Sequence, residues 1–128
     1  MPSLKFNPNQ SVIVLESKIF GTSNVTTARL VFDTGASRVI LPWKIVTALG
    51  IKIDPKNTIQ TTTASNIETV PSIVIPKMSV LGETAKNIEA IVKDLPDGSG
   101  VDGLLGLSFI KHFKIEIDFK NGFLNFSR

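Results

Sequence analysis

The chain contains no cysteine and only one histidine, His112. The absence of cysteine excludes disulfide bonds, thiolate metal sites and cysteine nucleophiles, and it suits either a reducing or an oxidising compartment. A single histidine does not support a histidine-based zinc site or a Ser-His-Asp triad. We therefore expect neither a metal ion nor a cofactor.

Long apolar runs and clusters of basic residues are also missing. No segment approaches the roughly 20 apolar residues of a membrane span, and residues 1–10 have no apolar core of a signal peptide. We expect no direct membrane contact and, by default, a cytoplasmic location, or an envelope or periplasmic one if an anchor precedes the chain. The net charge is +3, but the basic residues are scattered and no aromatic residues interleave with them, so no nucleic-acid partner is expected.

The composition is that of a folded β-rich chain. With 128 residues and a hydrophobic fraction of 42%, the sequence predicts one domain over residues 1–128 with a substantial core. Runs rich in β-branched residues predict strands at 11–20, 25–32, 57–63, 67–75 and 87–93. The third and fourth form a long, partly exposed hairpin around residues 64–66. Pro71 and Pro76 indicate that its second arm is an edge or bulged strand.

Two short helices and a second hairpin complete the expected all-β fold. Pro42 suits the first position of a helix that ends at Gly50, and residues 106–113 form another short helix. Residues 114–119 and 123–126 predict a hairpin. The Asn-Gly pair at 121–122 favours a type I′ turn between them.

An apolar strand runs directly into a carboxylate in the segment RLVFDTGASRVI. Asp33 follows the apolar residues 30–32, and a second apolar run resumes at Val39. A charge between two apolar runs costs free energy unless it is hydrogen-bonded or paired. Asp33 is therefore either a turn residue that faces water or a carboxylate kept in the interior for chemistry.

A weak internal repeat relates residues 28–54 to residues 100–118. Each segment contains a glycine turn, a short helix and an ending of the form Ile-Lys-Ile-Asp or Ile-Glu-Ile-Asp. The repeat indicates an internal pseudo-twofold, with Asp33 in one half and the Leu-Leu-Gly sequence at 104–106 in the matching place of the other.

These residues resemble the retropepsin-like aspartic proteases, a family that includes the retroviral enzymes, some eukaryotic domains and many bacterial domains. The resemblance rests on Asp-Thr-Gly-Ala-Ser at 33–37 between apolar runs, and on Leu-Leu-Gly about 70 residues later at the start of a helix. It extends over about residues 11–127 and is strongest with the bacterial members after residue 101. It implies a closed β-barrel of the acid-protease type with a flap hairpin.

The resemblance implies an aspartic endopeptidase that acts on an extended protein or peptide substrate. Such enzymes need two neighbouring carboxylates that share one proton, because like charges so close together cannot both ionise. Because this chain has a single Asp-Thr-Gly, the family pattern implies a homodimer in which Asp33 of each subunit meets its copy on the twofold axis. A catalytically weak or inactive domain used for dimerisation or peptide binding is the alternative.

The same resemblance assigns roles around Asp33. Thr34 would hydrogen-bond across the subunit interface, and Gly35 would let the backbone approach both the carboxylate and the substrate. Ala36, Ser37 and Arg38 would line the cleft, with Ser37 orienting the substrate main chain.

Residues 61–68 would form the flap that covers the substrate. Thr63, Ala64, Ser65 and Asn66 would contact the substrate there. The tip has no glycine, so we expect Asn66 to adopt any positive φ that the turn requires. Asp102 and Asp118 are expected to be turn and hairpin aspartates, and would be the candidate partners of Asp33 only in a monomeric enzyme.

Overall fold

The computed structural model describes residues 3–62 and 64–128. The chain folds into strands with two short helices, in agreement with the expected all-β class. In chain order the elements are β1 (Ser3–Lys5), β2 (Val14–Phe20), β3 (Val25–Phe32), β4 (Val39–Leu41), α1 (Trp43–Ala48), β5 (Thr58–Thr62), β6 (Ile67–Val80), β7 (Glu83–Val92), β8 (Gly103–Leu105), α2 (Leu107–Ile110), β9 (Lys114–Asp118) and β10 (Phe123–Ser127).

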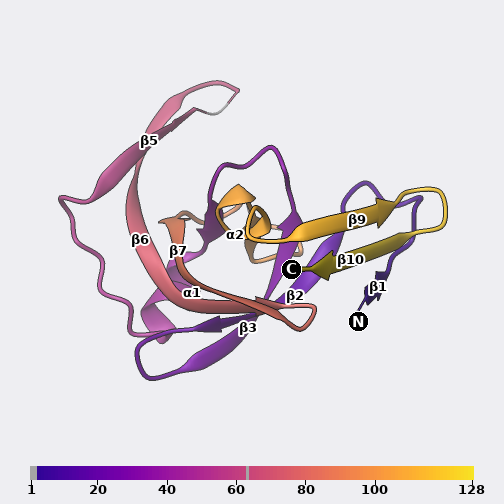
Figure 1. The fold of residues 1–128 in the computed structure, drawn as a ribbon. Coiled ribbons are helices and arrows are strands. Elements are labelled where there is room, and N and C mark those ends of the chain that lie inside the picture. The colour runs from indigo at the N-terminus through magenta and orange to yellow at the C-terminus, as the bar shows by residue number, and fades with distance from the viewer. Residues whose placement is uncertain (1–2, 63) are drawn as a thin grey trace.

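The larger sheet closes on itself. Its strand order is β2-β3-β8-β4-β7-β6-β5, and an additional pairing of β2 with β6 joins the ends of the first six strands into a closed barrel. The β5–β6 hairpin extends beyond the barrel on one side, and a separate three-stranded sheet of order β1-β10-β9 projects on the other (Figure 1). The barrel that the family resemblance implied is therefore present.

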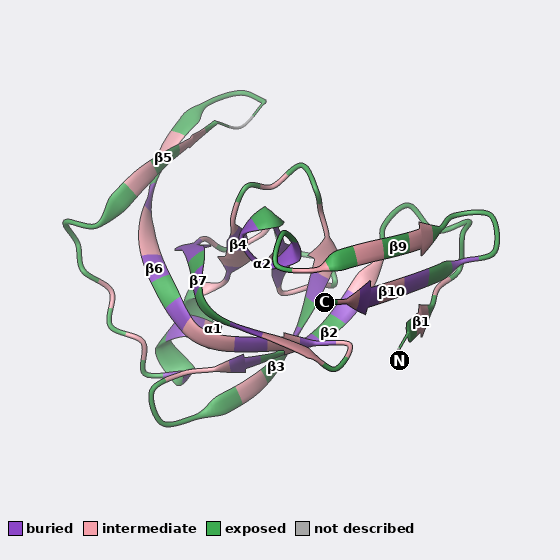
Figure 2. Ribbon diagram, in the orientation of Figure 1, coloured by how far each residue is buried: buried purple, intermediate pink, exposed green. Residues whose placement is uncertain are grey.

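The core follows the alternation of residues along the strands. In β2, Leu15, Ser17 and Ile19 are buried, whereas the residues between them are exposed. Successive side chains of a strand point to opposite faces, so this alternation gives one face to the barrel interior. In Figure 2, buried residues lie along β6, β7, α2 and β10. Phe109 of α2 and Phe126 of β10 belong to the same hydrophobic core.

Strand β6 is longer than the sequence predicts and changes partner along its length. It pairs with β5 over residues 67–71, with β7 over 72–75 and 77–80, and also with β2 over 77–80. The arm expected at 67–75 therefore has one paired strand at each position, in agreement with the expected edge or bulged strand, and two strands flank only its extension. Pro71 and Pro76 fall where β6 changes partner. The buried face of β6 also shifts by one residue near each proline, from Val70 to Ile73 and from Ile75 to Met78. The prolines are tolerated because regular pairing is interrupted at these two points.

The strand expected at 87–93 begins earlier, at Glu83. It forms a tight hairpin with β6 through Leu81 and Gly82, both of which have positive φ. Leucine is uncommon in this conformation, so no sequence signal marked the turn. Asn87 of β7 also has positive φ and lies opposite Pro76 of β6 in the register. The pairing of the two strands is therefore irregular on both sides at this position.

The two helices lie where the sequence predicts them. Pro42 precedes α1 as its N-cap rather than as its first residue, and Gly50 follows the helix with φ +69, as expected of a glycine after a helix end. Helix α2 is shorter than expected, since residues 111–113 continue only as a turn.

The hairpin of β9 and β10 has a four-residue loop, not the expected type I′ turn. Asp118 pairs with Phe123, and only Gly122 in the loop has positive φ. The Asp118 carboxylate accepts hydrogen bonds from the side-chain amide of Asn121 and from the backbone N–H groups of Lys120 and Asn121. The Asp118 side chain therefore holds the loop together. The expected two-residue turn would not need such a side chain.

These bonds make the hairpin sensitive to pH. The side-chain amide of Asn121, followed by the backbone N–H of Asn121, holds the pKa of Asp118 below its ordinary value of 3.8. A lowered pKa contributes stability that is complete above about pH 3.8 and is lost as the pH falls through the folded-state value. We expect Asp118→Ala to lower the melting temperature slightly at pH 7, and this difference to shrink below pH 3.8.

Thermal melts of both proteins between pH 7 and about pH 2.5 measure this effect. Asp97→Ala, a charge removal in another exposed loop, is the matched control. A difference between wild type and Asp118→Ala that stayed constant down to the lowest pH would contradict the role given to the ionised carboxylate.

Candidate active site

Residues 33–38, here called the Asp33 loop, connect β3 to β4. Strand β3 lies parallel to β8, with Phe32 opposite Leu105, and β4 pairs with β8 from the other side. Asp33 therefore leaves the sheet directly beside the end of β8. Residues 104–106 lie beneath the loop, in the place that the internal repeat predicts. The two repeat units differ in their endings, because residues 115–118 belong to β9 whereas residues 51–54 form no strand.

Asp33 is half-buried and held by the backbone. Its N–H donates to the carbonyl of Leu105 at 3.1 Å, and its carbonyl accepts the N–H of Ala36 at 3.3 Å. The N–H of Gly35 donates to Asp33 Oδ1 at 2.9 Å. One carboxylate oxygen is thus fixed by the loop itself, and no basic side chain of the described residues forms an ion pair with it.

The first residues of α2 support the other side of the loop. Leu107 donates its N–H to the carbonyl of Ala36 at 2.8 Å, and Ser108 donates its N–H to the carbonyl of Ser37 at 3.0 Å. These N–H groups have no partner within the helix, so the loop satisfies them. The position of the Asp33 loop is therefore coupled to a helix more than 70 residues away in sequence.

Gly106 allows this close approach. A Cβ added there would lie 2.3 Å from the carbonyl oxygen of Arg38 and 2.8 Å from that of Ala36. At Gly35 an added Cβ would lie 3.2 Å from Asp33 Oδ1. The glycine of Leu-Leu-Gly is thus required by the backbone of the Asp33 loop.

Ser108 is a structural residue that the sequence patterns did not predict. Its buried hydroxyl accepts the N–H of Val39 at 3.0 Å and donates to the carbonyl of Glu89 at 2.7 Å. It therefore joins α2 to both β4 and β7 at the base of the Asp33 loop. The only signal in the sequence was a serine in an otherwise apolar helix, and that signal does not specify its partners.

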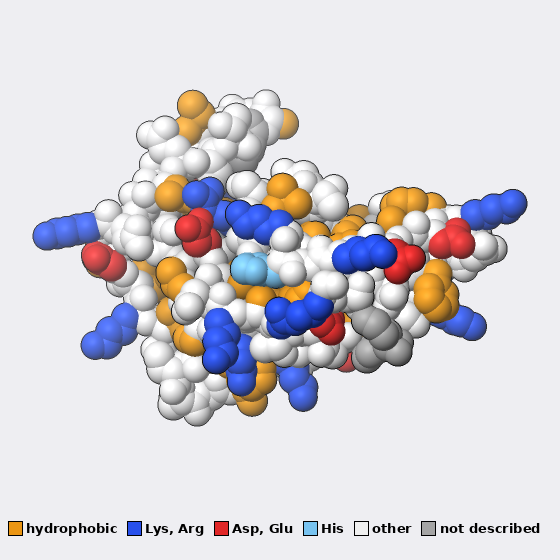
Figure 3. Space-filling model, in the orientation of Figure 1, with side chains coloured by type: hydrophobic (Ala, Val, Ile, Leu, Met, Phe, Trp, Pro, Cys, Tyr) orange, Lys and Arg blue, Asp and Glu red, His pale blue; other side chains and the backbone are white. Residues whose placement is uncertain are grey.

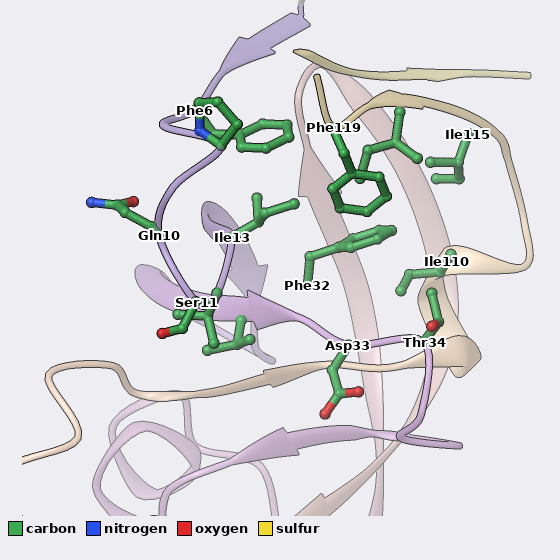
Figure 4. A pocket seen from close by; sticks show the side chains of 14 residues that line it. Phe6, Gln10, Ser11, Ile13, Phe32, Asp33, Thr34, Ile110, Ile115 and Phe119 are labelled. Carbon is green, nitrogen blue, oxygen red and sulfur yellow. The ribbon is translucent and has the colours of Figure 1, made fainter. Parts of the chain in front are cut away.

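Two grooves meet at the Asp33 loop. The first, here called the apolar groove, has a volume of about 660 Å³ and includes Asp33 and Thr34 in its lining. Figure 4 shows these two residues at one end of it, with Phe6 and Phe119 toward the other. Most of its remaining lining is aliphatic or aromatic, and includes Val12, Ile13, Val31, Phe32, Ile110, Ile115 and Ile117.

The second, here called the polar groove, has a volume of about 330 Å³ and lies between the Asp33 loop and the β5–β6 hairpin. Residues 35–38 form one wall and residues 59–62 of β5 the other. Ile40, Ile91 and Lys93 complete the lining. A chain laid in this groove would contact both the loop and the hairpin.

The structure brings together the expected residues of the loop but not those of the hairpin tip. Asp33 and Thr34 line the apolar groove, and Gly35, Ala36, Ser37 and Arg38 line the polar groove. Ala64, Ser65 and Asn66 are exposed and line neither groove, and Thr63 lies outside the described residues. The hairpin instead contributes residues 59–62, of which the flap expected from the sequence included only Thr61 and Thr62.

The expectation that Asn66 takes a positive φ is wrong. Apart from glycines, the described residues with positive φ are Leu81 and Asn87. Asn66 instead accepts the N–H of Ile67 through its side-chain oxygen at 2.9 Å. The turn is closed without a left-handed residue at that position.

Two other aspartates are structural, as expected. Asp102 accepts the N–H of Arg29 at 2.7 Å and donates its own N–H to the carbonyl of Arg29 at 2.8 Å. Asp118 organises the β9–β10 loop. Neither lines a groove at the Asp33 loop, so among the described residues Asp33 is the one acidic residue in either groove.

Comparison with known proteins gives consistent results. Residues 16–109 match the family described as aspartyl protease. The fold also matches the crystal structure of a retropepsin-like aspartic protease from Rickettsia conorii, with a TM-score of 0.67 and 26% sequence identity over 97% of this chain and 87% of that one. No curated protein sequence matches the chain. Within the described residues, no helix is long and apolar enough to span a membrane, and no group of three or more acidic or histidine side chains could hold a metal ion.

Proposed function

The chain belongs to the aspartyl protease family and has a retropepsin-like fold, and from this premise we propose that it is a homodimeric aspartic endopeptidase. The proposal rests on one observation above the others. Asp33 lines the apolar groove and is held by its own loop, residues 35–38 of that loop line the polar groove, and neither groove of the described chain holds a second carboxylate. The chemistry of the family needs two carboxylates, so a second copy must supply the other.

The apolar groove supports a second copy as its occupant. It adjoins Asp33 and Thr34, and two of its lining side chains are strongly exposed, with Phe119 at 64% and Val12 at 47%. Contiguous exposed apolar surface of this kind marks sites of protein association. A twofold-related chain covering this groove would bring its own Asp33 loop to the same seam.

In the proposed dimer the two Asp33 carboxyl groups share one proton, because like charges so close together cannot both be ionised. The ionised group removes a proton from a water molecule, whose oxygen attacks the carbonyl carbon of the peptide bond. The protonated group donates a hydrogen bond, and then its proton, to the carbonyl oxygen. Collapse of the tetrahedral intermediate breaks the C–N bond as the nitrogen is protonated, which yields a carboxylic acid and an amine.

The polar groove is the proposed binding site of the substrate. Its walls carry backbone groups of residues 35–38 and of β5, which suit an extended peptide that forms main-chain hydrogen bonds. The β5–β6 hairpin would act as the flap over this peptide and exclude water from it. Residues 64–66, at the exposed end of the hairpin, would reach the substrate only when the hairpin closes.

Cleavage of a diverse peptide library from about pH 3.5 to about pH 7.5 tests the proposal directly. Cleavage that depends on Asp33, by a protein that sediments as a dimer, is the expected result. A dimer that binds peptides and cleaves none would favour the alternative of a binding module. Activity that persists in a protein shown to be monomeric at every concentration would exclude the shared carboxyl pair.

Thr34→Ala is expected to weaken the dimer about ten- to thirtyfold with little change in the stability of the subunit. The Thr34 side chain is exposed beside the apolar groove, and in the proposed dimer it would form one hydrogen bond from each subunit, each contributing about 1 kcal/mol. Sedimentation velocity over a concentration series measures the dissociation constant.

Thr27→Ala, an exposed threonine on β3 that lines neither groove, is the matched control. Equal dimer affinity of the wild type and both variants would remove Thr34 from the interface.

A further inference from the structure

Two basic side chains line the polar groove, and each is already paired with a carboxylate outside it. Arg38 Nε lies 3.2 Å from Glu89 Oε2, and Lys93 Nζ lies 2.9 Å from Glu68 Oε2. Arg38 and Lys93 belong to the groove lining, whereas Glu68 and Glu89 do not. The groove therefore presents positive charge and no negative charge from its own described lining.

A carboxylate of a bound peptide can replace Glu68 or Glu89 in these two ion pairs at little cost in free energy. The carboxylate side chains are 42% and 63% exposed, and exposed ion pairs contribute little to stability because water solvates both charges. In the described chain, the contact of Arg38 with Glu89 uses Nε alone of the three guanidinium nitrogens. The other two nitrogens, Nη1 and Nη2, can therefore bind a second carboxylate end-on without loss of the first.

A second hollow adjoins the polar groove and repeats this character. It has a volume of about 330 Å³, shares Ser37 and Arg38 with the polar groove, and adds Lys111 and His112 beyond them. Glu89 also lines it, so its charge is more mixed. Figure 3 shows lysine and arginine side chains around the histidine on this face of the molecule. Lys111 thus adds a second positive charge to the hollow that Arg38 shares with the polar groove.

We propose that the polar groove is a subsite for an acidic side chain of the substrate, bound by Arg38 and Lys93. This inference rests on the proposed function and specifies its substrate class: polypeptides with aspartate or glutamate near the cleaved bond. Ile40, Ile59 and Ile91 line the same groove. These apolar groups exclude water from one side of the bound carboxylate, which strengthens its attraction to the two cations.

The proposed dimer adds a sharper consequence. A twofold axis through the Asp33 pair creates two copies of the polar groove, one on each side of the cleaved bond. Acidic residues are therefore enriched at equal distances on both sides of that bond. A monomeric enzyme with one groove would show the enrichment on one side only.

The test is the cleavage of a peptide library digested from a whole proteome, with cleavage sites read by mass spectrometry. We expect wild type to cleave bonds flanked by Asp or Glu at least about three times more often than their frequency in the library predicts, with the preference weakening as salt is raised. Lys93→Gln and Arg38→Gln should each bring this ratio of observed to expected cleavage closer to one, the value that means no preference.

Two further variants separate charge recognition from a merely structural effect of the ion pairs. Glu68→Gln and Glu89→Gln break the same pairs but leave the cations, so both should keep or increase the preference for acidic residues. If the Lys93–Glu68 contact served only to hold the hairpin, Lys93→Gln and Glu68→Gln would change the cleavage pattern in the same way, which would overturn the proposal. Lys18→Gln removes the same charge from β2, outside both grooves, and should leave the pattern unchanged.

Failure of this proposal is distinguishable from failure of the proposed function. Cleavage by wild type without acidic enrichment overturns the subsite and leaves the endopeptidase intact. If no peptide is cleaved, the endopeptidase fails, and binding then decides the subsite. The probes are two labelled degenerate peptide pools that are identical except for Glu or Gln at one position. The wild type should bind the Glu pool about threefold or more tightly than the Gln pool, and Lys93→Gln should bind both equally. Equal affinity of the wild type for the two pools overturns the subsite.

Discussion

Asp33→Asn is expected to fold and dimerise normally and to cleave peptides about 10²- to 10⁴-fold more slowly than the wild type. The amide has nearly the same shape as the carboxylate and keeps an oxygen that can accept the N–H of Gly35, now 2.9 Å from Oδ1. It cannot accept a proton from water, so the proposed base is lost from both subunits at once. Repulsion between the two carboxyl groups also disappears, so the dimer should be as tight as in the wild type or tighter.

Three measurements on the same preparation check this expectation. Initial rates on a cleaved library peptide give the loss of activity, sedimentation gives the dimer affinity, and thermal melting shows that the fold is kept. Asp97→Asn, in an exposed loop away from both grooves, is the matched control and should be fully active. Undiminished cleavage by Asp33→Asn would move the catalytic centre away from the Asp33 loop.

Gly106→Ala is expected to destabilise the protein by about 3 kcal/mol or more. The added Cβ would meet three atoms of the Asp33 loop backbone at 2.3, 2.6 and 2.8 Å, and none of them belongs to a flexible side chain. The loop or α2 must therefore move. That movement would disturb the hydrogen bonds of Leu107 and Ser108 to the loop, so the proposed cleavage activity should fall with the stability.

Chemical denaturation compares this variant with Gly98→Ala. Gly98 has open space around it but a φ of +82, so the same substitution there should cost only about 1 kcal/mol through backbone strain and should not affect cleavage. If Gly106→Ala were too unstable to purify, its soluble yield beside that of Gly98→Ala would give the same ranking. A Gly106→Ala protein as stable and as active as the wild type would show that the loop does not depend on this close approach.

Local sequence patterns were enough to predict the strands with strong alternation, the two short helices and the position of Asp33 at the end of an apolar strand. These features depend on residues close together in the chain, where side-chain periodicity and turn chemistry act directly. The sequence also indicates the family through Asp-Thr-Gly and Leu-Leu-Gly, because both motifs are short and contiguous. The β9–β10 turn was predicted wrongly even so, because the Asp118 side chain stabilises a longer loop than the Asn-Gly pair favours.

The way these elements form a site depends on contacts between residues that lie far apart in the sequence. Strand β6 joins three partners through two prolines, and Ser108 joins α2 to β4 and β7, because contacts between residues distant in sequence outweigh local preference. The same is true of the polar groove. Arg38 and Lys93 are 55 positions apart, and no local pattern places their charges in one hollow beside Asp33. The parallel pairing of β4 with β7 brings them together there, because Ile40, two residues after Arg38, lies opposite Ile91, two residues before Lys93.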